Sequence, residues 1–539
     1  MQVHHQHALN TSGETDPVWI HHLPYSKYPT FPSLSAHKQT DVAIIGAGIA
    51  GIQTAYELIS RGKKVTLLEA RHVLSGETGR TSGHLSNALD DGYAHIKEKH
   101  GSVGAKKAAE SHTWAIKRVG EVAKQIGVDC EYRTLPGYKF SSIPVGQKGH
   151  DKDIEEIKWE VKVAKESGVD VSFDDALKVK GWDGKIDQVG GAVFQGQATF
   201  HPTKYLSGLL DWLKNQEGFE CFGETRVTSI DENSSKGEVK LSTDRGYNVT
   251  ASSVVQATCI PLQKLSVIAE MGYYRTYCIA IRIPKGTIED CLIYDTEDPY
   301  KYTRVTPCDK ENDYLVIGGC DHKVGQEKTS GRFDELESWV RERFTSAGEV
   351  DYRWSGQIME PVDFMGFIGR NQGQKNVFIV TGDSGNGLTH GVLASRLIAD
   401  DIEGVQNDWA DLYKPSRLTP LTKSGLSMLG HDLQINSQYK RWLQSDVKDI
   451  EDIVSGSGGV VHEGLSPVAV YRDEQGQVHK MSAVCPHMKG VVCWNETEKS
   501  WDCPVHGSRF SCEGTCVEGP SKMGLHQIGQ GQMRAAAAH

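Results

Sequence analysis

Two pairs of side chains near the C-terminus have the types and spacing of metal ligands. They lie in Cys485-Pro-His487 and Cys503-Pro-Val-His506, and each pair offers one thiolate and one imidazole. A [2Fe–2S] cluster with two cysteines on one iron and two histidines on the other needs this set. A structural Zn²⁺ bound by the same four residues is the alternative. The motifs therefore predict a metal centre held between two loops.

The residues after the second motif distinguish these alternatives. His506 is followed by Gly-Ser508-Arg-Phe510, and Gly519-Pro520 lies a short way further on. A zinc site does not require these residues, whereas they resemble the residues at the same positions of Rieske [2Fe–2S] domains. The resemblance covers about residues 453–525. It implies a Rieske cluster whose ligands are Cys485, His487, Cys503 and His506.

This chain also departs from the Rieske pattern. Many Rieske domains carry two further cysteines that join the cluster loops in a disulfide, and the resemblance places these positions at Gly490 and Val505 here. Cys493 lies near the first position but has no evident partner, and we interpret Cys512 and Cys516 as ordinary thiols. We therefore expect cluster loops that are more mobile than those of relatives with the disulfide.

Two residues beside the second motif bear on the cluster potential. Ser508 can donate a hydrogen bond to a cluster sulfur, whereas Phe510 occupies a position that is often tyrosine and cannot donate one. Hydrogen bonds to the sulfurs tune the reduction potential. We therefore expect a potential below the upper part of the Rieske range of about −150 to +300 mV.

A second chemical signal lies near the N-terminus. Asp41-Val-Ala-Ile-Ile predicts a buried strand and leads into Gly46-Ala-Gly48-Ile-Ala-Gly51 and a helical stretch. Glycines at this spacing permit a tight turn, a close approach to a pyrophosphate and close helix packing. After the next predicted strand, Glu69 can accept hydrogen bonds from an adenosine ribose. The expected dinucleotide contacts are Gly46, Gly48, Ile49, Ala50, Gly51, Glu69, Ala70 and Arg71.

Two more glycine-rich turns favour FAD over NAD, which the fingerprint alone does not distinguish. One spans residues 76–84, soon after Glu69, and the other spans residues 382–391, between another predicted strand and a helix. Turns so far apart in the chain suit a long cofactor that is held at both ends. Further expected contacts are Thr78, Gly79, Arg80, Thr81, Ser82, Gly83, His84, Gly382, Asp383, Gly385, Gly387, Leu388 and Thr389.

These segments resemble the D-amino-acid oxidase and glycine oxidase superfamily of FAD-dependent oxidoreductases. The matching parts are the fingerprint, Thr78-Gly79-Arg80, Arg226-Val227, residues 360–369 and residues 382–391. The resemblance implies a substrate domain over the flavin ring and an adenine contact at Val227. It also implies oxidation of a substrate C–H bond, usually beside an amine nitrogen, with hydride transfer to flavin N5.

The predicted elements agree with this division. Strand runs alternate with amphipathic helical stretches between residues 41 and 404, and short alternating runs follow residue 453. This pattern predicts α/β and all-β parts respectively. We expect an α/β FAD-binding domain of the glutathione-reductase-like Rossmann type, an interleaved α+β substrate domain and a small all-β Rieske domain. The expected boundaries are 1–39 (N-terminal arm), 40–405 (FAD-dependent body), 406–452 (linker), 453–525 (Rieske domain) and 526–539 (tail). Within the body, FAD-binding segments are expected at about 40–94, 221–264 and 361–405, and the substrate domain at about 95–220 and 265–360.

Several polar residues have types suited to binding an amine or a carboxylate near a flavin. The expected catalytic residues are Arg304, Tyr302 and His201, and Asp321 and His322 are further candidates. Arg304 is the preferred anchor for a substrate carboxylate, because its guanidinium matches that group with two hydrogen bonds. For each of these residues, the alternative is a purely structural role in which its polar atoms are hydrogen-bonded within the protein.

Two histidines lie beside the cofactor turns. His84 is expected to line the flavin pocket, with covalent attachment of the flavin as the alternative. His390 is expected to face the flavin or to be structural.

The two expected cofactors handle electrons differently. A flavin accepts two electrons as a hydride, whereas a Rieske cluster passes one electron at a time. The combination predicts oxidation of an amine, amino acid or related small molecule, with single electrons leaving through the cluster to an external acceptor. One alternative is reverse flow from an external ferredoxin or reductase, for a reduction or an O2-dependent oxygenation. Another is a non-enzymatic redox carrier or sensor.

Composition limits the partners and the compartment. The 539 residues are 38% hydrophobic and 24% charged, with a formal net charge of −11 and no block of basic residues. We therefore expect no nucleic-acid and no membrane partner. No basic-then-apolar signal opens the chain, and the 12 cysteines suit a reducing compartment. This pattern predicts a cytoplasmic protein.

Overall fold

The computed structural model describes residues 16–186, 188–263, 266–327, 329–417 and 438–528. Its first layer is a mostly parallel sheet in the order β16-β17-β10-β1-β2-β7, which β8 and β9 extend through β10. The strands are β1 (Lys38–Ile45), β2 (Val65–Leu68), β7 (Phe219–Phe222), β8 (Val227–Asn233), β9 (Glu238–Thr243), β10 (Asn248–Gln256), β16 (Phe367–Arg370) and β17 (Val377–Thr381).

The sequence of β1 explains why both faces of this sheet are covered. Val42 and Ile44 pack in one buried cluster with residues of three helices, whereas Ala43 and Ile45 pack in another with residues of β8 and β9. Successive side chains of a strand point to opposite faces, so a continuous apolar run needs burial on both sides. The three helices are α2 (Ile49–Ser60), α5 (Pro202–Lys214) and α8 (Gly387–Glu403).

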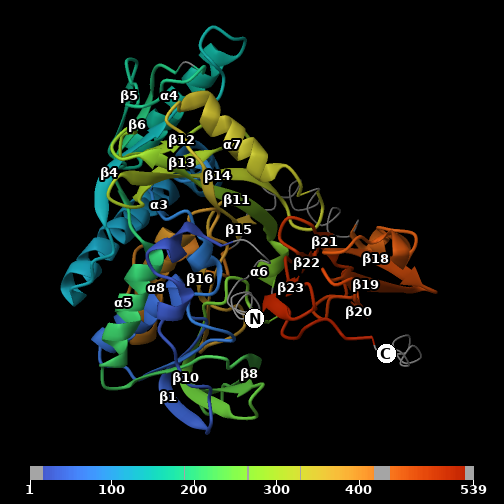
Figure 1. Ribbon diagram of the computed structural model, residues 1–539. Helices are drawn as coiled ribbons and strands as arrows, with labels where there is room; N and C mark the ends of the chain where they lie inside the picture. The colour runs from blue at the N-terminus through green and yellow to red at the C-terminus, as the bar shows by residue number, and fades with distance from the viewer. Residues whose placement is uncertain (1–15, 187, 264–265, 328, 418–437, 529–539) are drawn as a thin grey trace.

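A nine-stranded mixed sheet forms the second layer, in the order β15-β11-β14-β13-β12-β4-β6-β3, with β5 paired to β6. Figure 1 shows it at the top of the view, with β1 and β10 of the first sheet at the bottom. Its strands are β3 (His84–Leu85), β4 (Arg133–Lys139), β5 (Val171–Asp174), β6 (Gly191–Thr199), β11 (Met271–Pro284), β12 (Leu292–Tyr294), β13 (Tyr302–Pro307), β14 (Asn312–Lys323) and β15 (Val350–Pro361). The remaining helices are α3 (Gly92–Ile126), α4 (His150–Glu166), α6 (Ser266–Ala269), α7 (Arg332–Arg343) and α9 (Ala410–Tyr413).

The C-terminal part contains two small antiparallel sheets, β18-β19-β20 and β21-β22-β23-β24. Val460, Met481 and Trp501 are fully buried between them, together with both predicted cysteine ligands. Figure 1 shows this part in orange and red beside β11 and β15. Its strands are β18 (Ser457–Glu463), β19 (Ser466–Arg472), β20 (Val478–Ser482), β21 (Cys493–Asn495), β22 (Ser500–Asp502), β23 (Arg509–Ser511) and β24 (Cys516–Glu518).

The predicted fold class is confirmed: an α/β layer, an interleaved mixed sheet and a small all-β part. The boundaries within the body stay a prediction, and strand pairing refines the picture. β3, expected in an FAD-binding segment, pairs in the second sheet. α5, expected in the substrate domain, and β7, which spans the expected boundary at residues 220 and 221, belong to the first layer. No helix among the described residues is long and apolar enough to span a membrane.

Candidate functional site

One large cavity lies at the carboxyl ends of four parallel strands. Gly46 follows β1, Glu69 follows β2, residues 257–259 follow β10 and Gly382 follows β17, and all of them line a cavity of about 290 Å³. Ligands of open α/β sheets bind at this edge, where the loops after neighbouring strands diverge. The parallel sheet therefore positions the predicted cofactor turns around one space.

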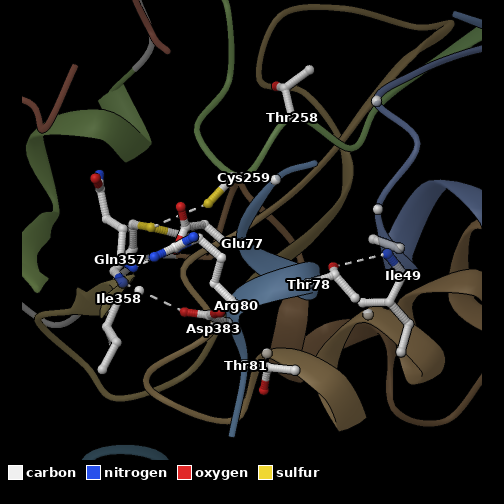
Figure 2. A pocket seen from close by; sticks show the side chains of 18 of the residues that line it. Ile49, Glu77, Thr78, Arg80, Thr81, Thr258, Cys259, Gln357, Ile358 and Asp383 are labelled. Carbon is white, nitrogen blue, oxygen red and sulfur yellow. Dashed lines mark hydrogen bonds between the residues drawn. The ribbon is translucent and has the colours of Figure 1, made fainter. Parts of the chain in front are cut away.

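The fingerprint glycines are required by the backbone around this cavity. Gly46 has a φ of +105°, and a Cβ there would lie 2.3 Å from the carbonyl oxygen of Ala257. A Cβ on Gly51 would lie 1.9 Å from the carbonyl oxygen of Gly46. Their absence lets α2 begin at the cavity wall, where the N–H of Ile49 donates to Thr78 Oγ1 over 3.1 Å (Figure 2). A helix N-terminus in this position suits a phosphate.

Glu69 and Arg71 define one end of the cavity. The Glu69 carboxylate accepts hydrogen bonds from the backbone N–H groups of Ala47 and Arg71, each over 2.9 Å. Val227 lines the same cavity. The buried Nη1 atom of Arg71 has no hydrogen-bond partner among the described residues. Because buried donors are almost always paired, this atom indicates a polar ligand, and the wall fits the adenosine half of a dinucleotide.

Most of the predicted cofactor contacts lie on the cavity wall. These are Gly46, Gly48, Ile49, Ala50, Glu69, Ala70, Arg71, Thr78, Arg80, Thr81, Ser82, His84, Val227, Gly382, Asp383, Gly385, Gly387 and Leu388. Gly51, Gly79, Gly83 and Thr389 lie behind the wall instead. A Cβ on Gly79 would lie 2.4 Å from the carbonyl oxygen of Leu74, and Thr389 hydrogen-bonds to His112 over 2.7 Å. These residues shape the loops that carry the lining residues.

Of the three residues predicted to be catalytic, the structure brings only Tyr302 to the cavity. Tyr302 is a lining residue, and its hydroxyl lies 3.0 Å from Oγ1 of Thr276. His201 is not among the lining residues. It caps α5, where its Nδ1 accepts a hydrogen bond from the N–H of Lys204 over 3.3 Å. Helix capping gives His201 a structural role, and its expected contact with the substrate stays a prediction.

Arg304 also lies outside the cavity wall. Its Nη1 donates to the carbonyl oxygens of Gly83 and Phe200, over 2.6 and 2.9 Å. Its guanidinium carbon lies 5.3 Å from the ring centre of Trp19, so the N-terminal arm covers it. Arg304 therefore joins the flavin-side turn to the second sheet, and its expected role as the anchor of a substrate carboxylate stays a prediction.

The remaining candidates also differ in whether they line the cavity. His84 lines the cavity, but its Nδ1 lies 3.0 Å from Ser82 Oγ and its Nε2 lies 3.1 Å from the carbonyl oxygen of Thr303. Both ring nitrogens are thus engaged, which favours a lining role over covalent attachment. His390 lines the cavity, whereas Asp321 and His322 do not.

Sequence reasoning missed residues of β11 and β15 that line the cavity, such as Thr276 and Gln357, and three further groups. Residues 257–259 follow β10, and the strand-to-turn pattern there could have indicated them. Asp90, Tyr294 and Tyr300 carry no motif. The third group comes from the C-terminal domain, and no local signal predicts that contact. It consists of Val517, Glu518, Gly519, Ser521 and Lys522.

The four predicted metal ligands come together in the C-terminal domain. Cys485 and Cys503 are buried, and the rings of His487 and His506 lie 5.1 Å apart. A hydrogen bond with Cys503 lowers the pKa of the Cys485 thiol to about 7. Among the described residues, no three histidine, cysteine or acidic side chains are grouped around one metal position. Two thiolates and two imidazoles are the donor set of a Rieske-type [2Fe–2S] cluster.

The positions of the missing disulfide face each other. A Cβ on Gly490 would lie 3.3 Å from Cβ of Val505 and 2.4 Å from its Cγ2 atom. The valine side chain thus fills the space beside the glycine. A side-chain interaction with Ser508 also lowers the pKa of the Cys485 thiol, and the expected hydrogen bond of Ser508 to a cluster sulfur stays a prediction.

Restoring both cysteines is expected to restore the disulfide. Disulfides join Cβ atoms at about 3.5–4.5 Å, close to the separation of these two positions. In the double variant Gly490→Cys with Val505→Cys, oxidation should remove both new thiols, as mass spectrometry of alkylated peptides measures. The single variants are the controls and should keep one free thiol each. Two free thiols in the oxidised double variant would contradict this geometry.

Several contacts dock the C-terminal domain on the body. Gln357 donates to the carbonyl oxygen of Gly507 over 3.2 Å, and Gln326 donates to that of Pro504 over 3.3 Å. Two further hydrogen bonds cross this interface: Cys493 Sγ donates to the carbonyl oxygen of Gly325, and Arg226 donates to the carbonyl oxygen of Cys516, each over 2.9 Å. Arg80 lies 4.0 Å from the carboxylate of Glu498, and the ring centres of Tyr273 and His506 are 6.0 Å apart. Figure 2 shows Glu77, Arg80, Cys259 and Gln357 gathered on one side of the cavity. This side is the one that the cluster loops contact.

Comparisons with known proteins agree with this geometry. Residues 444–528 match the model of the Rieske [2Fe-2S] domain. A putative Rieske 2Fe-2S iron-sulfur protein, YhfW of Bacillus subtilis (strain 168), is 28% identical over 505 residues, which cover 93% of this chain and 95% of YhfW. The γ-glutamylputrescine oxidoreductase of Escherichia coli (strain K12) is 23% identical over 393 residues, 70% of this chain and 87% of that protein.

A solved structure supports the fold. The crystal structure of glycine oxidase from Geobacillus kaustophilus superposes with a TM-score of 0.59 at 17% identity, covering 71% of this chain and 99% of that one. The family model described as FAD dependent oxidoreductase matches residues 41–401. The chain therefore belongs to the FAD dependent oxidoreductase family and carries a C-terminal Rieske [2Fe-2S] domain.

Proposed function

We propose that this chain oxidises an amine, an amino acid or a related metabolite and passes the electrons singly to an external acceptor. When bound, FAD takes a hydride from the substrate C–H bond and the cluster carries one electron at a time. The names of two similar proteins, γ-glutamylputrescine oxidoreductase and glycine oxidase, support this substrate class. Cys485, His487, Cys503 and His506 would hold the cluster, and the lining residues given above would hold FAD.

The contact between the cluster loop and the cavity wall carries this proposal. Gly507 directly follows His506, and its carbonyl oxygen accepts a hydrogen bond from the buried side chain of Gln357. Gln357 itself lines the cavity. One residue thus links the loop of a cluster ligand to the FAD cavity. A carrier that exchanged electrons only with outside partners would gain nothing from this link.

Anaerobic mixing of the holoenzyme with a panel of amines and amino acids tests the proposal. The flavin absorption band is expected to bleach first and the Rieske band to follow. If no compound bleaches the flavin, substrate oxidation is wrong. If turnover requires a reduced ferredoxin or reductase, electrons flow in the opposite direction.

The substitution Gln357→Leu is expected to slow the second, cluster-reducing phase several-fold, and much more than it changes flavin bleaching. It removes the hydrogen bond to Gly507, worth about 1 kcal/mol, and leaves the carbonyl oxygen of Gly507 without that donor. Stopped-flow spectroscopy at both bands measures the two phases. Gln326→Leu is the matched control, because Gln326 donates to the same loop at Pro504 but does not line the cavity. Equal slowing in both variants would assign the effect to docking alone.

A further inference from the structure

The cavity has opposite charges at its two ends. Arg71, Arg226 and Lys522 line the adenosine end together with Glu69. At the other end, where β13 and the start of α8 meet, the lining residues include Asp90 and Asp383. Arg80, the remaining arginine of the described wall, donates to the carbonyl oxygen of Ser355 and lies 4.0 Å from Glu498. This end therefore has an excess of carboxylates.

The histidines at this end add no positive charge. Burial lowers the pKa of His84 to about 3 and that of His390 to about 3, so both rings are neutral at pH 7. Arg304, the basic residue expected here, is turned away toward Gly83 and Phe200. A substrate carboxylate at this end would thus meet acidic groups, while Arg80 of the same wall is engaged by Ser355 and Glu498.

Asp90 is held in place to face a ligand. Its carboxylate accepts hydrogen bonds from the side chains of Tyr300 and Asn386. A Cβ on Gly385 would lie 1.7 Å from Asp90 Oδ2, so the backbone of the late glycine loop closes directly against this carboxylate. This close approach and the two hydrogen bonds hold the carboxylate in place. Burial raises the pKa of Asp90 to about 6, which leaves it mostly ionised at pH 7.

A tyrosine beside Asp90 independently indicates a polar ligand. Tyr294 is only 7% exposed and lines the cavity, yet its hydroxyl has no hydrogen-bond partner of normal geometry among the described residues. Tyr300 and Tyr302 line the same region. Three phenol groups offer ring faces and oxygen atoms, both of which attract a cation.

More carboxyl groups lie behind this wall. Burial, with the nearby charge of Asp90, raises the pKa of Asp321 to about 7, and burial together with Asp91 and Asp321 raises that of Glu360 to about 8. At pH 7 these two groups are therefore partly or mostly protonated, and a bound cation would favour their ionised forms.

We propose that this end of the cavity binds a substrate with a positively charged amine and no carboxylate beside it, and that Asp90 is its anchor. The inference rests on the proposed function, since it names the substrate class of the same site. A protonated alkylamine or diamine has this chemistry, whereas a free α-amino acid does not. The ammonium N–H groups donate to the Asp90 carboxylate, while the apolar carbon chain lies against the tyrosine rings.

A charge-matched set of ligands tests this proposal on the full-length holoenzyme. The probes are 1,4-diaminobutane, butylamine, 4-aminobutanoate and glycine, and binding is followed by the perturbation of the flavin absorption band before any bleaching. We expect the two amines to bind at least about 10-fold more tightly than the two carboxylate-bearing probes. Equal or tighter binding of 4-aminobutanoate or glycine, or no binding of either amine, overturns the proposal.

The substitution Asp90→Asn provides the second arm. It keeps the size of the side chain and removes its charge, so amine binding should weaken about 10- to 100-fold, the range for a hydrogen bond to a charged group. FAD content and the Rieske spectrum report whether the variant folds. Asp151→Asn removes the same charge from an exposed position of α4 and should bind as the unmodified protein does. Unchanged amine affinity in a folded Asp90→Asn variant overturns the anchor. Amines that bind through Asp90 without bleaching the flavin would leave this inference intact and refute the proposed oxidation.

Discussion

Replacing Cys503 by serine is expected to remove the [2Fe–2S] cluster and to leave FAD bound. Cys503 is 2% exposed and offers one of the two thiolates that the cluster requires. A serine hydroxyl is a much poorer ligand for iron in such clusters, which are held by soft thiolates. None of the four predicted ligands is among the described residues that line the FAD cavity. Iron content and the electron paramagnetic resonance signal should therefore fall to background, while the flavin spectrum persists.

Cys493 offers a matched control for this experiment. It is buried in the same domain, but its thiol donates to the carbonyl oxygen of Gly325, which a serine hydroxyl can also do. Cys493→Ser should keep the cluster. Loss of iron from both variants would mean that cysteine packing, rather than ligation, decides cluster retention. A full cluster in Cys503→Ser would contradict the ligand set.

Replacing Gly46 by alanine should abolish stable FAD binding. Its φ of +105° disfavours any side chain, and the added Cβ would lie 2.3 Å from the carbonyl oxygen of Ala257. Relief of this clash must separate β1 from β10 at the point where both lead into the cavity. We expect FAD affinity to fall by at least about 100-fold, or about 3 kcal/mol. Flavin fluorescence during titration of the apoprotein measures the change.

Gly237→Ala separates this clash from ordinary backbone strain. Gly237 also has a positive φ, +66°, but its turn between β8 and β9 leaves at least 4 Å of open space around the position that a Cβ would take. This variant should lose a little stability and bind FAD normally. The Rieske spectrum should be unchanged in both variants, because the cluster loops are distant in sequence and separately folded. Similar FAD affinities for the two alanine variants would show that the close approach at Gly46 is unimportant.

The parts of the site that lie in continuous motifs were predictable. The turn from Gly46 to Gly51 follows from a strand and a helix that are adjacent in sequence, and the Rieske motifs carry their own ligands. Tyr302 and Arg304 show where such reasoning ends. They are two residues apart on β13, and strand alternation places them on the same face. Gly83 and Trp19 contact Arg304, which lies outside the cavity wall. The sequence of β13 alone does not predict these contacts.

Contacts between distant segments account for the remaining residues. Asp90 reaches the cavity because the loop after β17 closes against it, and Glu518 reaches it because a second domain docks there. Both depend on tertiary packing rather than on local periodicity. The sequence shows only that the two cysteines of the usual disulfide are missing. The structure adds that the side chain of Val505 fills the space beside Gly490.

The residues that the Rieske domain places on the cavity wall also constrain how the holoenzyme assembles. Val517, Glu518 and Lys522 close part of the space that receives FAD, and Arg226 ties Cys516 to the body beside them. The docked domain therefore narrows the access to this space. We expect it to slow both the entry and the loss of the flavin. The interface that would bring the two redox centres together would thus also help to retain one of them.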